Sequence, residues 1–578
     1  MLGFWRHRSA VVLVLAGLMI GACALVASTW SSFGHTWDEP EHLAAGLQLV
    51  DTGHYDYDIQ HPPIARVLLA IGPYWAGARA QGLPPPDGKA EGIAILYGAG
   101  HYDLYLSLAR AGTLPFLALL ILVTYLWGRT LMDRPGALVA AALVATTPTV
   151  LGHAGLATID VAAAASCLLA VYAFRQWLRR GRYRDAVFLG LAAGLALGVK
   201  MSAIPYGGIA GVVVLGLHWL ERRHAAPLGP AIRARRWWLG GFGALLLVGL
   251  VLDLAYGGRW IYLTDHLHHF NQAIGYLFGY KTGVFKEPAY DLFEYLPVPL
   301  ALQWYLGALQ AITVHNDNGH LSYVLGALHT GGWPKFYLLA LGVKTQWPLL
   351  FGAVAGFAVL LRRAVRDAQV AALTLPLMGL GILWFASDYS HINIGVRHVL
   401  VLYPLLAVGA AVALQALWRR GQYAGAAGWG AWLLVAVAVV AQAYSLTTTW
   451  PDYLAYFNPF APVPAKILVD SDLDWGQDFK HLRHRLAVLH VPAVSLAYLG
   501  TADLAREGLP PYRLLAPDEP TTGWVAVSAL ARAYAPRHLA WLDAYPVRER
   551  IGQTIDLYYI PAVSDPAAAG VGTTPARP

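Results

Sequence analysis

The feature that most constrains this chain is a series of long apolar stretches with few charged residues. We place them at 11–30, 106–127, 136–152, 160–177, 186–199, 203–220, 237–256, 336–361, 369–386, 396–417 and 428–447. Most are long enough for a helix across a bilayer, which takes about 20 residues. Only 13% of the residues are charged, against about 25% in a soluble domain. We therefore expect a polytopic α-helical membrane protein with about eleven transmembrane helices.

The first apolar stretch follows a basic N-terminus, an arrangement that also occurs in signal peptides. It continues past Cys23 for about 18–20 residues, which is long enough to span a bilayer, so we interpret it as an uncleaved transmembrane helix. Cys23 and Cys167 both lie in apolar stretches, and they predict neither a disulfide framework nor a zinc site.

The distribution of arginine predicts which side of the membrane each connection faces. Arginine-rich segments lie at the N-terminus and at 129–134, 175–184, 221–236, 362–366 and 418–421. Cytoplasmic connections carry an excess of basic residues, and with about eleven helices all these segments fall on one side. The N-terminus is then cytoplasmic, and the long connections 31–105 and 257–335 face outward, as does the tail from residue 448.

The tail from residue 448 is richer in charge and proline than the rest of the chain. Strands are expected at "AKILVDSD" (465–472), "AVSLAYLG" (493–500) and "IDLYYIP" (555–561), an amphipathic helix at "QDFKHLRHRLAVL" (477–489), and a strand followed by a helix at "GWVAVSALARAYA" (523–535). This pattern predicts a transmembrane domain at 1–447, a small α/β domain outside the membrane at 448–563, and a disordered end at 564–578.

Ionisable residues gather in "HTWDEPEHLAAG" (35–46), directly after the first apolar stretch. Pro40 suits the first turn of a helix, so Asp38 or Glu39 is placed to cap that helix. A carboxylate close to the bilayer also tends to mark a functional site, where burial raises its pKa towards a value suited to proton abstraction. Capping and catalysis both remain open for this pair.

Two further polar residues lie at outer ends of predicted helices. His61, in "QHPPIARVL" (60–68), would be held by two prolines at the start of an interfacial helix, or would be a solvated turn residue. Asp160 opens the fourth helix, where a capping role is the alternative to a functional one.

Basic residues at outer helix ends are exceptions to the arginine pattern. Lys200 lies in "LGVKMS", Lys344 in "ALGVKTQWP", and Arg397 and His398 in "NIGVRHVLVLYP". Such side chains either extend to the membrane interface or bind an anion. Converging cations suit a lipid-linked phosphate or diphosphate, since arginine offers a fork of donors and lysine a point charge.

Several common motifs are missing from the chain. "DSDLDWGQD" (470–478) has alternating carboxylates, but it lacks the glycine and glutamate that a calcium loop needs at its sixth and twelfth positions. We expect a connection between a strand and a helix there. The sequence has no Walker loop, dinucleotide-binding glycine motif, GxSxG or HExxH.

Taken in order, the motifs resemble bacterial members of glycosyltransferase family 39, which have the GT-C fold. The matching segments are "WDEPEHLAAG…GHYDYDIQHPP", "HAGLATIDVAAA", "GVKMSA", "VKTQWPLL", "NIGVRHVLVLYPLL" and "DLDWGQDFKHL", which run from about residue 35 to 560. This family includes protein O-mannosyltransferases and lipid A aminoarabinose transferases. The chain lacks the MIR-type insertion of the former and differs from the latter in its tail.

The resemblance implies a polyprenyl- or dolichyl-phosphate sugar donor used on the outer face of the membrane, and it implies that this membrane is the inner membrane of a bacterium. It implies that Asp38 is the catalytic base, that Glu39 is the paired acidic residue, and that His61 and Asp160 occupy family positions. Our hypothesis is that Asp38 deprotonates an acceptor hydroxyl, which attacks the anomeric carbon with inversion. The other residues fall into two groups: Lys200, Lys344, Arg397 and His398 would hold the phosphate, and Asp160, Glu39 and His61 would orient sugar or acceptor.

The expected sugar is a mannose-like hexose or a modified pentose, and the acceptor a lipid, glycan or protein; no nucleic acid is expected. No cofactor is required, although a divalent metal bound by Asp38, Glu39 and Asp160 stays open. Two other functions also stay open. One is a transporter or flippase of lipid-linked sugars, which would often show repeats and interrupted helices that the sequence does not display. The other is a non-catalytic glycan-binding membrane protein.

Overall fold

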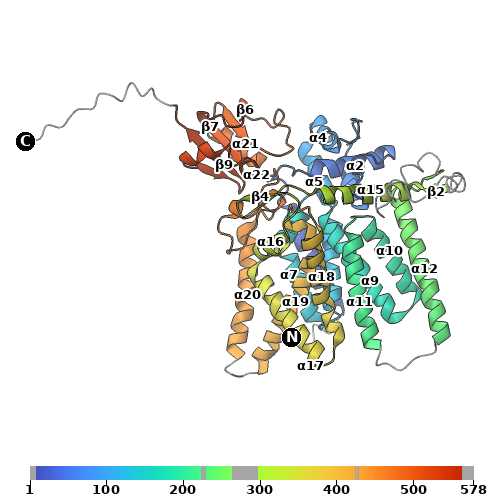
Figure 1. Ribbon diagram of the computed structural model, residues 1–578. Helices are drawn as coiled ribbons and strands as arrows, with labels where there is room; N and C mark the ends of the chain where they lie inside the picture. Colours follow the sequence, from blue (N-terminus) through green and yellow to red (C-terminus); the bar gives the residue numbers. More distant parts are fainter. Residues whose placement is uncertain (1–7, 223–229, 263–296, 424, 426–427, 563–578) are drawn as a thin grey trace, which may run out of the picture.

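A computed structural model describes residues 8–222, 230–262, 297–423, 425 and 428–562 of the chain. Within this part the protein is a bundle of long helices with a small sheet domain at one end (Figure 1). The predictions for residues 1–7, for most of the second outer connection (263–296) and for the tail 564–578 lie outside the described residues.

Apolar helices form the bundle. They are α1 (Arg8–Ala27), α6 (Leu114–Gly128), α7 (Arg134–Ala145), α8 (Pro148–Ala154), α9 (Asp160–Arg180), α10 (Tyr183–Leu197), α11 (Ala203–Arg222), α12 (Pro230–Ala255), α16 (Phe336–Lys344), α17 (Trp347–Arg366), α18 (Thr374–Tyr389), α19 (Leu402–Tyr423) and α20 (Gly428–Thr449). Nine helices among the described residues are long and apolar enough to cross a membrane. The prediction of a polytopic helical membrane protein is confirmed.

The predicted number of about eleven spans is not reached, for two physical reasons. The pair α7 and α8 is bent by 61° at a break before Pro148, so it counts at most as one broken span. Helix α10 has 15 residues, which at 1.5 Å per residue gives about 22 Å, less than the apolar core of a bilayer. The sequence does not display an interrupted helix, but the structure has one at α7 and α8.

Arginine collects at the end of the bundle that lies away from the sheet domain. The last turns of α9, α11 and α17 contain Arg180, Arg222 and Arg366, respectively. In Figure 1 the lower ends of α11, α12 and α17 lie on the side of the N-terminus, opposite the sheet domain. The predicted gathering of arginine at one end is confirmed for these helices, and the cytoplasmic orientation of that end stays a prediction.

The first outer connection folds into four helices at the opposite end of the bundle. They are α2 (Glu39–Thr52), α3 (Ile64–Trp75), α4 (Gly88–Gly98) and α5 (Tyr102–Ala111), of which α5 leads directly into α6. From the second outer connection the structure describes β1 (Trp260–Tyr262), β2 (Pro297–Pro299), α15 (Leu300–Asn318), β3 (Ser322–Val324) and β4 (Ala327–His329). Helices α2 and α15 lie across this end of the bundle (Figure 1).

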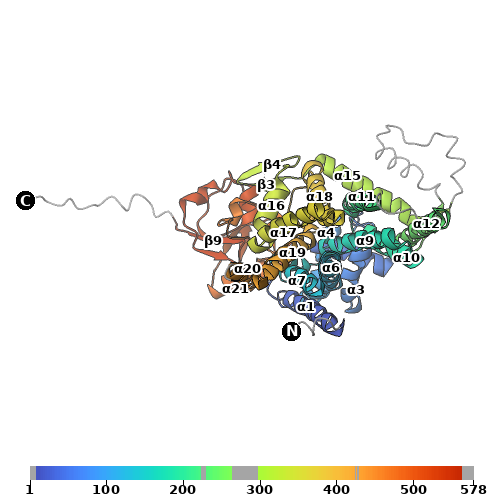
Figure 2. The ribbon, with the colours of Figure 1, turned by 90° about the horizontal axis from the view of Figure 1, so that it is seen from below.

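Small residues let the bundle helices approach closely. The main apolar core lies among α6, α7, α9 and α19, and it is rich in buried alanine. Where α17 crosses α19, Gly356 faces the backbone of Gly409, and a Cβ there would clash with the neighbouring helix. Close contacts of this kind stabilise helix pairs in membranes, where water exclusion contributes little between helices. Seen along the bundle, α10 and α12 lie at one edge and the sheet domain at the other (Figure 2).

The C-terminal domain contains a five-stranded mixed sheet with the order β6-β5-β7-β9-β8. Its elements are α21 (Phe479–Val488), β5 (Val494–Ala497), β6 (Tyr512–Leu514), β7 (Gly523–Ser528), α22 (Ala529–Tyr534), β8 (Glu549–Ile551) and β9 (Ile555–Ile560). Strand β5 is parallel to β6 and β7, whereas β9 is antiparallel to β7 and β8. The predicted α21, β5, β7, α22 and β9 are confirmed, and β6 and β8 were not foreseen.

The strand predicted at 465–472 is wrong. This segment forms two short 3-10 helices, η6 (Pro464–Lys466) and η7 (Asp470–Asp472), with one isolated bridge from Leu468 to Val324. Its apolar residues pack outside the sheet: Leu468 lies in the main core of the bundle, and Val469 packs with Leu473 and with Leu530 of α22. Both residues are buried, so their apolar character alone does not distinguish this segment from a strand.

Candidate active site

Four segments that are distant in sequence bring charged side chains together at the outer-loop end of the bundle. Asp38 immediately precedes α2, and Asp160 is the first residue of α9. Lys200 lies in the break between α10 and α11, and the 3-10 helix η4 (Val396–Val399) contains Arg397. A carboxylate at the N-terminus of α9 is favoured by the helix dipole, which helps to hold Asp160 in its ionised form.

These side chains form a chain of alternating charges, which we call the ion-pair chain (Asp38, Arg397, Asp160 and Lys200). Arg397 Nη1 lies 2.7 Å from Asp38 Oδ2 and 3.6 Å from Asp160 Oδ2, so one guanidinium serves two carboxylates. Asp160 Oδ1 accepts a hydrogen bond of 2.6 Å from Lys200 Nζ. Asp160 and Lys200 are buried, whereas the side chain of Asp38 is 22% exposed.

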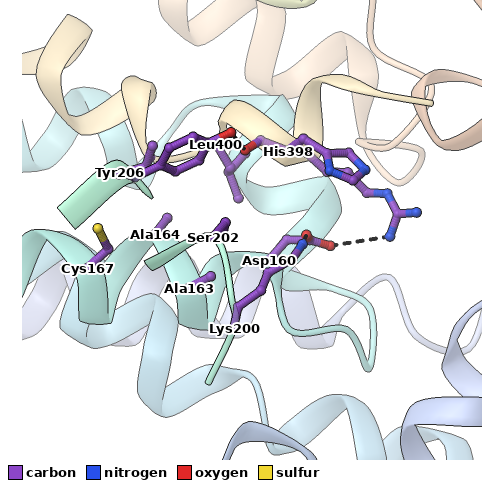
Figure 3. A pocket seen from close by; sticks show the side chains of 11 residues that line it. Asp160, Ala163, Ala164, Cys167, Lys200, Ser202, Tyr206, His398 and Leu400 are labelled. Carbon is purple, nitrogen blue, oxygen red and sulfur yellow. Dashed lines mark hydrogen bonds and ion pairs between the residues drawn. The ribbon is translucent and has the colours of Figure 1, made fainter. Parts of the chain in front are cut away.

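The ion-pair chain borders a hollow that is polar on one side and apolar on the other. Residues from α9, the break between α10 and α11, α11 and the segment 397–401 line it: Asp160, Ala163, Ala164, Cys167, Lys200, Ser202, Tyr206, Arg397, His398, Leu400 and Val401. Figure 3 shows Asp160 and Lys200 at one end and Cys167 and Tyr206 at the other. Such a surface suits a molecule with a charged head and an apolar body.

Two buried nitrogen atoms at the polar end have no hydrogen-bond partner among the described residues. They are Arg397 Nε and His398 Nε2, and both residues line the hollow. The backbone oxygen of His398 accepts a hydrogen bond from Tyr206, which helps to fix this part of the chain. Both nitrogens can therefore meet an anionic group.

The environment of Asp38 differs from the sequence expectation. Asp38 occupies the N-cap position of α2 but makes no side-chain capping hydrogen bond, because its carboxylate pairs with Arg397. Burial alone would raise the pKa of Asp38, but Arg397, with His42 and Lys89, outweighs burial and holds the pKa below its ordinary value. The expected rise in pKa is therefore wrong, and Asp38 is ionised at neutral pH.

Glu39 does not share the partners of Asp38. Its carboxylate lies in a separate, buried hydrogen-bond network. Its carboxylate accepts hydrogen bonds from Arg110 Nε and Nη2, at 2.8 and 2.9 Å, and from the backbone N–H groups of Thr36 and Ala157, both at 2.7 Å. Glu39 and Arg110 are each 1% exposed. All these partners are satisfied within the protein, so the geometry favours a role for Glu39 in joining α2, α5 and the segment before α9.

His61 lies beside the ion-pair chain, in a second polar network. Its ring is 6.1 Å from the ring of His42, whose Nδ1 accepts a hydrogen bond from Arg66. Arg66 also pairs with Asp58. Burial lowers the pKa of His61 to about 3, so its ring is neutral at physiological pH. His61 Nδ1 is buried without a hydrogen-bond partner among the described residues.

Lys344 does not join the other cations. Its ammonium group donates hydrogen bonds to the backbone oxygens of Leu454, at 2.8 Å, and Asp472, and its side chain is fully buried. The lysine connects the end of α16 to the segment that leads into the C-terminal domain. Two of its three N–H donors are used by backbone oxygens, and the ammonium lies 4.4 Å from the ring centre of Phe457, which favours a structural role over phosphate binding.

Sequence reasoning missed two residues that touch the site or its supports. The guanidinium of Arg397 lies 4.3 Å from the ring centre of Trp475, which comes from the "DWGQD" segment. Arg110 lies inside the apolar stretch 106–127, and an arginine in such a stretch needs a buried partner. The position of Arg110 in an apolar stretch could therefore have predicted that it has a buried acidic partner, here Glu39. No sequence pattern predicts the contact between Trp475 and Arg397.

The residues named for a metal do not form one ligand set. Asp38 and Asp160 both face Arg397, while Glu39 is enclosed by Arg110 and backbone N–H groups. Within the described part of the chain no group of three or more His, Cys, Asp or Glu side chains has the geometry to hold a metal ion.

Comparison with known families supports the resemblance seen in the motifs. Residues 109–250 match the family model described as dolichyl-phosphate-mannose-protein mannosyltransferase. The matched part runs from α5 into α12 and includes Asp160 and Lys200 of the ion-pair chain. The predicted likeness to glycosyltransferase family 39 is thereby confirmed. No curated protein matches the chain.

Several solved structures share a distant likeness with the chain. ArnT from Cupriavidus metallidurans bound to undecaprenyl phosphate is 12% identical, with 97% of this chain and 100% of that chain covered and a TM-score of 0.43. The Saccharomyces cerevisiae Pmt1–Pmt2 complex bound to its sugar donor is 11% identical, with 76% and 90% covered and a TM-score of 0.49. The Archaeoglobus fulgidus oligosaccharyltransferase tethered to an acceptor peptide is 14% identical, with 77% of this chain but only 55% of that chain covered and a TM-score of 0.47. Likeness at this level carries no argument about substrate or mechanism.

Proposed function

We propose that this chain transfers a sugar from a polyprenyl-phosphate donor to an acceptor hydroxyl. Its family-model match and its long apolar helices indicate a multi-pass membrane glycosyltransferase like those of family 39. The observation that carries the proposal is the ion-pair chain beside a hollow with one charged and one apolar side. A polyprenyl-phosphate sugar has the same division, with an anionic phosphate between an apolar chain and a polar sugar.

The charges of the site fit the charge changes of this reaction. Asp38 takes the proton of the acceptor hydroxyl while the acceptor oxygen bonds to the anomeric carbon, with inversion. The bond from that carbon to the phosphate oxygen breaks, and the phosphate leaves with one more negative charge. Negative charge thus moves from Asp38 to the phosphate, and Arg397 and Lys200 stabilise it there.

Arg397 links the two halves of this charge movement. In the structure it pairs with Asp38 and stays within 3.6 Å of Asp160. A donor phosphate that competes for Arg397 weakens its pair with Asp38, and the carboxylate then becomes a stronger base. Asp160 remains to balance the charge of Lys200 and to orient the guanidinium.

The remaining predicted roles are assigned from these positions. We assign His398, which lines the hollow, to the donor phosphate and His61 to the sugar or acceptor, whereas Glu39 and Lys344 support the surrounding backbone. We further propose that the site faces the outer side of a bacterial inner membrane, because the arginine-rich helix ends lie at the opposite end of the bundle.

The test is sugar transfer by purified protein from a panel of synthetic polyprenyl-phosphate sugars, including mannose-like hexoses and modified pentoses. Wild-type protein should release polyprenyl phosphate in proportion to sugar transferred. Asp38→Asn should bind the donor but release almost none. Movement of intact donor across vesicle membranes without cleavage would instead identify a transporter. Retained glycan binding with no cleavage of any donor would identify a non-catalytic protein.

A further inference from the structure

The segment 470–478 ("DSDLDWGQD"), which we call the roof segment, contacts both loops that carry the Asp38–Arg397 pair. The backbone N–H of Trp37, next to Asp38, donates to the backbone oxygen of Trp475 at 3.0 Å. The backbone N–H of Val396, next to Arg397, donates to Asp472 Oδ1 at 3.0 Å. Each residue of the ion pair therefore has a neighbour fixed by the same nine-residue stretch.

Further contacts strengthen both connections. The Ser471 hydroxyl donates to the backbone oxygen of Ile394 at 2.6 Å, and Gly395 packs so closely on Ser471 that a Cβ there would clash. On the other side, the N–H of Gly34 donates to the backbone oxygen of Gln477 at 2.9 Å. The roof segment thus holds the first outer connection and the loop before η4 at a fixed separation.

The roof segment is also anchored in the C-terminal sheet domain. Asp474 Oδ2 accepts the N–H of Leu530, at the start of α22, at 2.8 Å. Asp478 Oδ2 accepts the N–H groups of Gln553 and Thr554, which lead into β9, at 3.0 and 3.2 Å. The carboxylates thus point in two directions, with Asp472 towards the membrane domain and with Asp474 and Asp478 into the sheet domain.

Trp475 makes direct contact with the proposed phosphate-binding group. The side chain is 2% exposed, and its ring lies 4.3 Å from the guanidinium carbon of Arg397. A ring at this distance attracts a cation and limits how the flat guanidinium can turn. The indole therefore helps to keep Arg397 between Asp38 and Asp160.

We propose that Trp475 is a positioning residue for the transfer reaction and that, through the roof segment, the C-terminal domain completes the active site. This inference rests on the proposed function and deepens it. It assigns the domain a role inside the site, distinct from recognition of an acceptor at a distance.

The test compares Trp475→Leu with Trp475→Phe and with Trp524→Leu in the full-length protein. Trp524 is a matched control, because Arg548 lies 4.6 Å above its ring in the same domain, away from the ion-pair chain. Trp475→Leu should raise the KM for the donor about 3- to 30-fold, with a smaller change in kcat. Trp475→Phe, whose ring attracts a cation less strongly, should recover only part of the loss and leave the donor KM a few fold above wild type. Trp524→Leu should behave like wild type.

A second readout separates positioning from general damage. With Arg397 less firmly held, the acid side of the pH profile of kcat/KM should move to higher pH in Trp475→Leu, since Arg397 keeps the pKa of Asp38 low. Equal kinetics and equal pH profiles for the two leucine variants would overturn the proposal. If Trp475→Leu does not fold, Trp475→Phe decides: a rise of a few fold in donor KM supports the proposal, and no change overturns it.

Asp38→Asn is measured in parallel to separate this inference from the proposed function. Full transfer by Asp38→Asn would remove the proposed role of Asp38 and with it the basis of the inference. Loss of transfer in Asp38→Asn together with wild-type behaviour of the Trp475 variants would remove only the role of Trp475.

Discussion

Asp38 and Glu39 are neighbours in sequence, yet they belong to two different ion-pair networks. Asp38 pairs with Arg397 next to a hollow, shares that partner with Asp160 and keeps a side chain that is 22% exposed. Glu39 pairs with Arg110, accepts hydrogen bonds from five donor groups of the protein and is 1% exposed. The difference shows two roles for a carboxylate. A carboxylate that is partly exposed and shares its cation with another group can still react. A carboxylate that is fully buried and has a cation of its own stabilises the fold.

The sealed network should show the largest effect on stability. Glu39→Gln leaves Arg110 as a buried charge without a counter-charge, and breaking such a pair costs about 3–5 kcal/mol. We expect a fall of that size in the free energy of unfolding, measured in detergent by chemical denaturation. Glu549→Gln is the control, because the Arg485–Glu549 pair is about one-third exposed and should contribute about 0–1 kcal/mol. An equal fall in the free energy of unfolding in the two variants would show that the Glu39–Arg110 pair does not stabilise the fold.

The accessible network should show its largest effect on the rate of transfer. Arg397→Gln removes the group that stabilises the leaving phosphate, and loss of one such donor lowers kcat about 100- to 1,000-fold. Arg397→Lys keeps the charge but lacks the fork of donors, so it should recover only part of the rate. Wild-type kcat in Arg397→Gln would exclude this residue from the reaction.

Lys200 should matter less than Arg397, because Asp160 keeps the guanidinium as a partner when the ammonium group is lost. A hydrogen bond between charged groups contributes about 1.5–3 kcal/mol, so Lys200→Met should lower kcat/KM about 10- to 100-fold. Kinetics with a polyprenyl-phosphate sugar would measure it. A larger loss than in Arg397→Gln would reverse the ranking of the two cations.

How far could the sequence alone lead to this comparison? The resemblance and the arginine pattern correctly placed Asp38, Asp160, Lys200 and Arg397 at one end of the bundle, and the structure brings them into one chain. The direction of each side chain could not be predicted, because it depends on partners far away in sequence. Lys344 illustrates this limit, since its donors are taken by the backbone oxygens of residues more than a hundred positions later.

Some secondary-structure elements could be predicted from the sequence, and others could not. Long apolar helices could be predicted because their composition alone requires a membrane, and α21 could be predicted from its amphipathic pattern. The apolar segment 465–472 was mistaken for a strand, because burial against a membrane domain and burial in a sheet select the same residues. The bend between α7 and α8 depends on how Pro148 and its neighbours pack, and composition does not record that.

The last expected effect concerns pH and the roof segment. Burial raises the pKa of Asp474 to about 7, so the folded protein holds a proton that the unfolded chain, with a carboxyl pKa near 4, releases. The stability contributed by this proton is full below about pH 4 and is lost as the pH rises to about 7, by at most about 1.4 kcal/mol for each pH unit.

Thermal unfolding of wild type and Asp474→Asn at pH 5 and pH 8 would measure this contribution. The amide does not ionise, so the unfolding temperature of the variant should depend less on pH. Asp543→Asn, in which the replaced carboxylate is 71% exposed, should keep the pH dependence of wild type. The same pH dependence in all three proteins would contradict the role given to Asp474.

The most direct test of the difference between the two networks is single-turnover sugar transfer by Asp38→Asn at saturating donor, with the unfolding temperature measured on the same sample. The asparagine cannot accept the acceptor proton, and loss of a general base lowers the rate about 100- to 10,000-fold. We expect a fall within that range with an unfolding temperature close to that of wild type. A rate within a few fold of wild type, in a protein that is folded and binds the donor, would contradict the assignment of Asp38 as the base.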